Sequence, residues 1–324
     1  MTAAPGTDRA YVLHGLRLGV AATGEAERAA AGIHARLAGL PLDGGAHDVT
    51  FEIRAGEDHG FGRPASARPI YEPPVGEVVY DGGADLLYIE YGPRLRVLCD
   101  AREGCSVASA AGMAEEDLWS LSHPLFTLPL VELVKRRGLF GLHAGGVCRG
   151  GKALLLPGTS GSGKSTLTLA LARAGFGFLG DDTLFLARRS GALRVLAFPD
   201  EFDLTDRTVA FFPELAPLLD AAQPTGWRKR QVRVEEAYGA PVVWESEPAV
   251  LVFPRVSGAP SSQLLPLNPG EALLELVPNV LLTEPASTQA HLDALATLVK
   301  RCRCWRLETG TDLDEAVALL DGLL

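Results

Sequence analysis

The sequence has few cysteines and no long apolar run. Five cysteines in 324 residues are too few and too irregularly spaced for a disulfide framework, and no cysteine or histidine pair accompanies Cys302 and Cys304 as a zinc site requires. These thiols are predicted to be free and buried, which indicates a reducing cytoplasm. No run approaches the ~18 apolar residues of a membrane helix, and residues 1–10 lack the apolar segment of a signal peptide. We therefore expect a cytoplasmic protein without membrane contact.

Positive charge is also scarce. Lysine and arginine total 30 against 40 aspartates and glutamates, which gives a net charge of −10. Such a chain repels a phosphate backbone, so no broad nucleic-acid-binding surface is expected, although a local anion site is compatible with this charge. Hydrophobic residues make up 47% and charged residues 22%, which excludes wholesale disorder. The length of 324 residues corresponds to about two domains.

The first third of the chain has the pattern of a small β-rich domain. Tyr11–Val20 alternates apolar and polar residues, with one slip at His14-Gly15, and is predicted as one strand, followed by a helix over Glu25–Leu37. Four further strands are predicted at Asp48–Ile53, Gly76–Tyr80, Leu86–Tyr91 and Leu95–Cys99. Asp81-Gly82-Gly83, between two of them, is predicted as a hairpin turn. The pattern indicates a mostly antiparallel, β-rich accessory domain over residues 1–110.

The remainder, residues 111–324, has the alternating strands and helices of an α/β domain. Glu115–Arg137 is predicted to be helical, with breaks at Pro124 and Pro129. Strands are predicted at Leu139–Val147, Ala153–Leu156, Phe176–Leu179, Thr183–Ala187, Leu193–Phe198, Val250–Phe253, Leu264–Leu267 and Cys304–Leu307. Helices are predicted at Lys164–Ala174, Pro269–Leu276, Thr288–Lys300 and Asp312–Leu323.

A glycine-rich loop carries the clearest motif. Gly158–Thr166 matches the pattern G-x-x-x-x-G-K-[ST], with an apolar strand before it and a helix after it. In this pattern the glycines let backbone N–H groups converge on phosphate oxygens, the lysine adds a cation, and the hydroxyl ligates Mg²⁺. We predict a nucleoside triphosphate site made by Gly158, Thr159, Ser160, Gly161, Ser162, Gly163, Lys164, Ser165 and Thr166.

Two aspartates and a histidine are predicted close to this loop. Asp181 and Asp182 follow the strand after the loop's helix, and His143 lies on the strand two elements earlier. Adjacent aspartates can simply open a turn, and a histidine can be packed in a core. Beside a phosphate site, however, one carboxylate can hold Mg²⁺ while the other takes a proton from the accepting hydroxyl. With only two asparagines, Asn268 and Asn279, the chain has no Asn-Lys-x-Asp guanine motif.

His143-Ala144, the loop Gly158–Thr166 and Asp181-Asp182, in this order and spacing, resemble the catalytic domain of HPr kinase/phosphorylase. That family comprises bacterial serine kinases whose fold is related to phosphoenolpyruvate carboxykinase. The resemblance implies an α/β P-loop catalytic domain of this type that uses ATP and Mg²⁺. It implies these roles: Lys164 and Ser165 bind phosphates and Mg²⁺, Asp181 is the base, His143 assists it, and Asp182 serves the metal. The two aspartates could exchange roles.

The chain departs from that family in identifiable places. The N-terminal region does not resemble the family's regulatory domain, and Glu201 stands near the missing Glu-x-Arg-Gly stretch, as a replacement metal ligand. The chain is more similar to stand-alone HPr-kinase-related proteins, including lasso-peptide-tailoring kinases, in part through Tyr11-x-x-x-Gly15-Leu16. This similarity implies a serine-containing peptide or protein as the acceptor. A homo-oligomer is compatible with it.

A cationic cluster, Trp227-Arg228-Lys229-Arg230, stands out in the second half of the chain. It is either a solvated loop or a phosphate clamp, because a kinase needs a cation to neutralise charge on the leaving phosphate. Lys229 and Arg230 are the candidates for this role, and Arg255 is a further one.

The predicted function is an ATP- and Mg²⁺-dependent kinase that transfers the γ-phosphate to a serine hydroxyl of a peptide or protein. The accessory domain over residues 1–110 would recognise this acceptor. Two alternatives remain open: a catalytically silent nucleotide-binding regulator of the same fold, and a small-molecule kinase. Asp181 beside Asp182 argues against the first, because binding alone needs no base. Neither length nor motifs separate the second from a peptide kinase.

Overall fold

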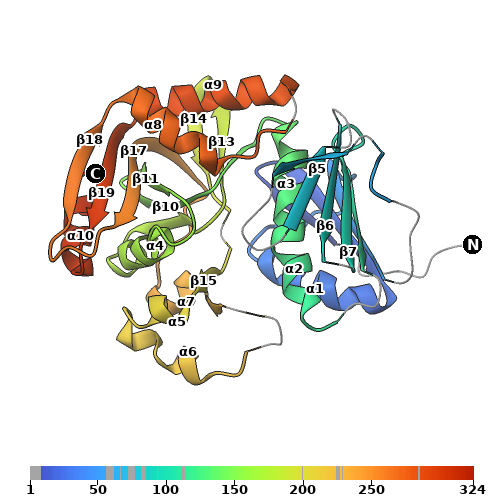
Figure 1. The fold of residues 1–324 in the computed structure, drawn as a ribbon, viewed down its shortest axis with the longest axis horizontal. Helices are drawn as coiled ribbons and strands as arrows, with labels where there is room; N and C mark the ends of the chain where they lie inside the picture. Colours follow the sequence, from blue (N-terminus) through green and yellow to red (C-terminus); the bar gives the residue numbers. More distant parts are fainter. Residues whose placement is uncertain are drawn as a thin grey trace, which may run out of the picture. The chain divides into compact units, whose positions relative to one another are not determined.

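The computed structural model describes residues 9–55, 62–65, 67–71, 77–81, 85–92, 94–110, 114–198, 200–223, 227, 229–283 and 285–324. Residue contacts divide the chain into two compact units (Figure 1). The first comprises Met1–Arg137, Gln223–Trp227 and Thr283–Thr288, and the second comprises Gly138–Ala222, Arg228–Leu282 and Gln289–Leu324. The division falls after Arg137 rather than near residue 110, because helix α3 (Pro124–Lys135) packs on the sheet of the first unit.

The first unit is built on one mixed sheet. Its strands are β1 (Arg9–Leu13), β2 (Leu16–Thr23), β3 (Val49–Ala55), β4 (Arg68–Tyr71), β5 (Glu77–Asp81), β6 (Leu86–Tyr91), β7 (Leu95–Asp100) and β8 (Cys105–Ala110), in the order β1-β2-β3-β8-β7-β6-β5-β4. Strand β3 is parallel to β2 and β8, and the other pairs are antiparallel. Its helical elements are η1 (Gly24–Ala26), α1 (Glu27–Arg36), α2 (Asp117–Ser122) and α3. Strands β4 and β8 have no counterpart among the predicted strands.

The predicted strand Tyr11–Val20 is wrong, because this segment folds as a hairpin. Strands β1 and β2 pair antiparallel, and Leu13 faces Leu16 beside the turn. Both turn residues are left-handed, with φ of 51° at His14 and 93° at Gly15. Two such residues are what a type I′ hairpin turn requires. The predicted turn at Asp81-Gly82-Gly83 falls partly outside the described residues.

The second unit contains a larger mixed sheet. Its strands are β9 (Phe140–Leu142), β10 (Ala144–Arg149), β11 (Lys152–Pro157), β12 (Gly177–Gly180), β13 (Leu184–Arg189), β14 (Ala192–Leu196), β17 (Glu245–Val256), β18 (Gln263–Leu267) and β19 (Arg303–Thr309). The main order is β12-β10-β11-β17-β14-β13-β9, and β19 pairs with β17 and β18. Strands β11, β17 and β19 run parallel to one another, whereas the other pairs are antiparallel.

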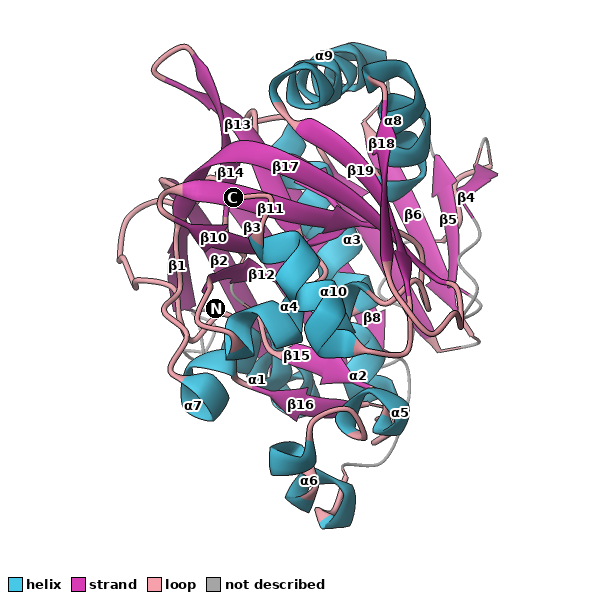
Figure 2. Cartoon of the chain, turned by 90° about the vertical axis from the view of Figure 1, so that its left-hand side faces the viewer, coloured by secondary structure: helices cyan, strands magenta, loops and turns pink. Residues whose placement is uncertain are grey.

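Helices cover both faces of this sheet, which explains its uninterrupted apolar strands. Leu154 and Leu156 of β11 face helices α4 (Lys164–Arg173) and α10 (Leu313–Asp321). Leu155 faces the opposite layer, formed by α8 (Pro269–Leu276) and by the part of α9 (Pro285–Arg301) that belongs to this unit (Figure 2). The connection between α8 and α9 begins with η3 (Val277–Asn279).

A small subdomain packs against the outer side of α4. It contains the two-stranded sheet of β15 (Phe202–Leu204) and β16 (Arg230–Val232), with α5 (Asp206–Val209), η2 (Pro213–Leu215), α6 (Pro217–Asp220) and α7 (Val234–Tyr238). Phe202 and Phe212 lie in the same buried cluster as Leu169 of α4. The subdomain is therefore fastened to the helix that follows the glycine-rich loop.

Two predictions about chain breaks need correction. The predicted helix Glu115–Arg137 is interrupted at His123, before Pro124, but continues through Pro129, whose neighbours Phe126 and Leu130 are buried. The helix tolerates the one hydrogen bond lost at Pro129 because the packing of its apolar face outweighs that loss.

The predicted strand Leu139–Val147 is two strands separated by His143. Strand β9 pairs with β13, whereas β10 pairs with β11 and β12.

Two smaller expectations concern thiols and membranes. Each of the five cysteines is a free thiol, and Cys304 is buried as predicted, but Cys302 is only partly buried. Within the described ranges, none of the helices combines the length and the apolarity that crossing a membrane requires.

Candidate active site

The glycine-rich loop adopts a backbone that few other residues allow. Gly161 and Gly163 have φ of 82° and 98°, in the left-handed region. A Cβ on Gly158 would lie 2.7 Å from Ser162 Oγ, so the loop folds closely back on itself. Glycine at these three positions therefore follows from conformation and from space.

The loop ends at the N-terminus of α4, which begins at Lys164. The first amides of a helix have no intrahelical acceptor, and the helix dipole places a partial positive charge there. The first turn of α4 contains no acidic residue that would cancel it. Lys164 is only 5% exposed, and its carbonyl accepts a hydrogen bond from the buried Thr168 hydroxyl at 2.9 Å. This end of α4 has the features of an anion site.

Glycines of the neighbouring strands bring the aspartates to the same place. A Cβ on Gly145 of β10 would lie 2.1 Å from Thr168 Oγ1 and 3.3 Å from the Asp181 carbonyl oxygen. A Cβ on Gly180, at the end of β12, would lie 2.7 Å from the Thr183 carbonyl oxygen. Only backbone without side chains permits this close packing. As a result, Lys164 Nζ lies 3.7 Å from Asp182 Oδ1.

Asp181 is a buried carboxylate. The residue is 2% exposed, and among the described residues neither of its carboxylate oxygens has a hydrogen-bond partner of normal geometry. Burial, together with the charge of Asp182, raises the pKa of Asp181 well above its usual range, although Lys164, the nearby Ser165 hydroxyl and Lys229 oppose the effect. A buried carboxylate whose oxygens lack hydrogen bonds of normal geometry is costly to the fold, so the site has room for a further donor or proton at Asp181.

Asp182 has the opposite character. Its side chain is 44% exposed. Loss of solvent around the carboxylate acts to raise the pKa of Asp182, but the charges of His143, Lys164 and Lys229 outweigh it, and the pKa is lowered. Two adjacent aspartates thus differ in environment, and such a pair can divide proton transfer from cation binding.

His143 lies between β9 and β10 and holds the aspartate turn. Its Nδ1 is 2.8 Å from the Asp182 carbonyl oxygen, which can only accept, so Nδ1 carries the proton. The residue reaches solvent, yet desolvation of the ring lowers the pKa of His143, with Lys164 and Lys229 adding to the effect and Asp182 opposing it. Its backbone N–H donates to the Asn279 carbonyl oxygen at 2.8 Å. The histidine therefore contacts Asp182 through the backbone.

The cationic candidates separate in the structure. Lys229 is half-buried and acts electrostatically on His143, Asp181 and Asp182. Arg230, in β16, instead makes its contacts within the small subdomain: it pairs with Asp206 at 3.2 Å and donates to backbone carbonyl oxygens. Arg255 pairs with Glu275 at 3.4 Å. Arg228 is outside the described residues, and Trp227 belongs to the first unit, where its ring lies edge-on to His123.

Glu201, the predicted replacement metal ligand, is engaged elsewhere. Its carboxylate is 2.7 Å from the Arg233 guanidinium. Across the described ranges, no three His, Cys, Asp or Glu side chains gather as a metal site would require. The Asp182 carboxylate and the Ser165 hydroxyl are thus the oxygen groups close to the loop, whereas Glu201 pairs with Arg233.

Some neighbours of the site had no sequence signal. Asn279 follows α8, far along the chain, and contacts His143 only through its backbone. Val256 ends β17 beside Gly163. Thr168 could have been noticed as a hydroxyl one turn after Lys164, on the face that meets Gly145.

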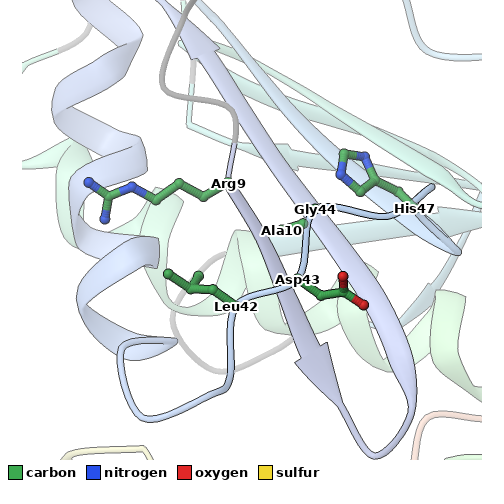
Figure 3. Close-up of a pocket in the computed structure, with 6 residues that line it drawn as sticks. All are labelled: Arg9, Ala10, Leu42, Asp43, Gly44 and His47. Carbon is green, nitrogen blue, oxygen red and sulfur yellow. The ribbon is translucent and has the colours of Figure 1, made fainter.

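The first unit carries a separate, open pocket of about 450 Å³ (Figure 3). It is lined by Arg9, Ala10, Leu42, Asp43, Gly44 and His47. Asp43 pairs with Arg17 at 2.7 Å, and the His47 ring covers Gly19. None of the predicted site residues lines this pocket.

Comparisons with known proteins add little to this geometry. No protein-family model and no curated protein matches the chain. Among solved structures, the Hpr(Ser) kinase/phosphatase from Coxiella burnetii matches with 19% identity and a TM-score of 0.27, covering 49% of this chain and 93% of that one. A TM-score of this size supports no inference about function, which therefore rests on the site itself.

Proposed function

We propose that the second unit is a kinase that uses ATP and Mg²⁺ to phosphorylate a serine hydroxyl of a peptide or protein. One observation carries the proposal: the buried Asp181, whose carboxylate oxygens have no hydrogen bond of normal geometry among the described residues, lies near the N-terminal end of α4 together with Lys164 and Asp182. A phosphate site, a cation and a carboxylate with free acceptor capacity are the components of phosphoryl transfer.

The residues present suit the triphosphate and the metal. The amides of Gly158–Thr166 and the Lys164 ammonium would bind the β- and γ-phosphates. The Ser165 hydroxyl and the Asp182 carboxylate are the hard oxygen ligands that Mg²⁺ prefers, and Asp182 stays ionised because its pKa is lowered. When bound, Mg²⁺ would supply positive charge to the phosphate oxygens.

Asp181 would orient the acceptor hydroxyl and take its proton. The hydroxyl oxygen forms a bond to the γ-phosphorus, and the bond from that phosphorus to the bridging oxygen of ADP breaks. The proton passes to the Asp181 carboxylate, whose raised pKa makes it a stronger acceptor than an exposed aspartate. Lys164 and Lys229 offset the charge that gathers on the transferred and leaving groups.

A silent nucleotide-binding protein is a weaker candidate. A buried carboxylate without a hydrogen bond of normal geometry among the described residues destabilises the fold, and binding alone gives no reason to keep it. The sequence resemblance favours a peptide or protein serine over a small molecule, and we assign acceptor recognition to the first unit.

An isosteric pair of variants tests the proposal. Asp181→Asn should leave MgATP affinity near wild type and lower transfer from labelled ATP to a serine-peptide library by about 10²-fold or more, as for a lost general base. Asp182→Asn should instead raise the Mg²⁺ concentration required. Lys164→Ala, as a control, should weaken MgATP binding itself.

Two results would contradict this assignment. If millimolar MgATP neither binds by calorimetry nor raises the melting temperature, the phosphate site is wrong. If Asp182→Asn abolishes transfer at saturating Mg²⁺ while Asp181→Asn changes only the Mg²⁺ requirement, the two aspartates have the reverse roles.

A further inference from the structure

The parallel strands of the second unit end at one edge of the sheet. Strand β11 pairs with β17, and β17 pairs with β19, all in the same direction (Figure 2). Leu155 of β11 is level with Leu251 of β17. Strand β11 turns into the glycine-rich loop after Pro157, but β17 continues to Val256 and so extends alongside the loop.

Val256 is an exposed apolar side chain beside that loop. Its Cγ2 lies 3.6 Å from the position that a Cβ of Gly163 would occupy, and the residue is 56% exposed. Val250 and Val252, which point to the same face by strand alternation, are buried under α4 and α10. The strand thus presents its last apolar residue to solvent at the N-terminus of α4.

The surrounding backbone holds Val256 in place. The Ser257 N–H donates to the Thr309 carbonyl oxygen at 3.0 Å, and the Thr311 N–H donates to the Ala259 carbonyl oxygen at 3.0 Å. The Gly310 N–H donates to Ser262 Oγ at 2.9 Å. The loop after β17 is therefore tied along the end of β19.

The direction of phosphoryl transfer distinguishes the two sides of the loop. In an in-line reaction the acceptor oxygen and the leaving oxygen lie on opposite sides of the phosphorus. Asp181 reaches the loop from the side of β10 and β12, which places the acceptor there. Strand β17 is the other neighbour of β11. The leaving nucleoside diphosphate accordingly lies on the side of β17.

We propose that Val256 contacts the nucleoside moiety of the bound triphosphate, its base or ribose. This inference rests on the proposed function and adds the subsite for the leaving group. The contact is apolar: a nucleoside face covers the exposed valine and both lose contact with water. The phosphates bind independently of it, through Lys164 and the loop amides.

Comparison of two ligands tests the subsite. Calorimetry would give the dissociation constants of MgATP and of Mg²⁺-tripolyphosphate, which lacks the nucleoside. Val256→Ser should weaken MgATP binding about threefold to tenfold, as for a few lost apolar contacts, and leave tripolyphosphate unchanged. Val256→Ile should bind both like wild type. Leu274→Ser, at an apolar residue 77% exposed on α8, is the matched control and should change neither.

Three results would overturn the inference. If Val256→Ser weakens both ligands equally, the residue supports the phosphate loop and not the nucleoside. If it changes neither, the nucleoside lies elsewhere. If wild-type protein binds neither ligand, the proposed function itself fails and the inference falls with it. A melting temperature near wild type for each variant shows that folding is intact.

Discussion

Two adjacent aspartates in unlike surroundings define the chemistry at the scale of single residues. Asp181 is enclosed and its pKa is raised, while Asp182 is partly exposed beside Lys164 and its pKa is lowered. The difference arises from the turn after β12, which directs consecutive side chains into different environments. Neighbouring carboxylates whose pKa values move apart are a recurrent basis for dividing acid–base and electrostatic roles.

His143 provides the first prediction at this scale. Its ring donates to the Asp182 carbonyl oxygen, so it positions the turn that carries both aspartates. We expect His143→Ala to lower kcat while the KM for MgATP and the melting temperature stay near wild type. His143→Asn retains a donor near the Nδ1 position and should restore part of kcat.

The same two variants distinguish this role of His143 from a purely structural one. If His143 is purely structural, His143→Ala would lower the melting temperature and leave kcat unchanged. Equal activity of the alanine and asparagine variants would contradict a role for the hydrogen bond.

The sequence specifies single site residues only where a motif constrains them. Gly158, Gly163, Lys164 and Ser165 follow from a pattern whose spacing is set by phosphate geometry. Lys229 was one of two equivalent cations, and the structure separates it from Arg230 because Arg230 pairs with Asp206. No sequence pattern indicates Val256, because its place beside the loop depends on how far β17 extends beyond the end of β11.

At the scale of elements, local signals locate helices better than strand partners. Helix α8 begins and ends where the sequence predicts, because Asn268, Pro269 and Glu271 form a capping box with proline at the first position. The prediction of one strand over β1–β2 is wrong because the alternation resumes at Leu16, directly after the slip at His14 and Gly15, where the chain turns. The break at His143 depends on long-range pairing, since β9 and β10 join different strands.

The hairpin turn gives the prediction at this scale. Gly15 has φ of 93°, and an added Cβ would meet nothing within 4 Å, so conformation is the only strain that alanine introduces there. Gly15→Ala should lower the free energy of unfolding by about 1–2 kcal/mol, measured by urea denaturation.

A matched glycine makes this measurement specific. Gly39 also has open space around an added Cβ but does not have a left-handed φ. Gly39→Ala should therefore leave stability unchanged or raise it slightly. Equal losses for both variants would show that the turn does not depend on a left-handed residue.

At the scale of the whole molecule, the units are not consecutive in sequence. The chain enters the second unit at Gly138 and returns to the first at Gln223–Trp227 and again at Thr283–Thr288. Composition and periodicity report on neighbours in sequence, so they cannot reveal that short distant segments complete the first unit. A simple division of the chain into two consecutive stretches therefore omits part of each unit.

Thr283 shows what such a segment contributes. Glu132 and Lys135 of α3 form an ion pair at 2.7 Å and are both almost fully buried. The Thr283 hydroxyl donates to Glu132 Oε2 at 2.7 Å and accepts from Lys135 Nζ. Because burying two charges is favourable only when their remaining hydrogen-bonding capacity is used, this hydroxyl should matter for the first unit.

We therefore expect Thr283→Val, which keeps the shape and removes the hydroxyl, to destabilise the first unit by about 1–3 kcal/mol. Hydrogen exchange should show faster exchange in α3, while Lys164–Arg173 of the second unit keeps its protection. Thr297→Val, whose hydroxyl bonds to a backbone carbonyl on the exposed side of α9, is the control and should leave α3 unchanged. Unchanged exchange in α3 of the Thr283 variant would mean that the buried ion pair does not depend on the Thr283 hydroxyl.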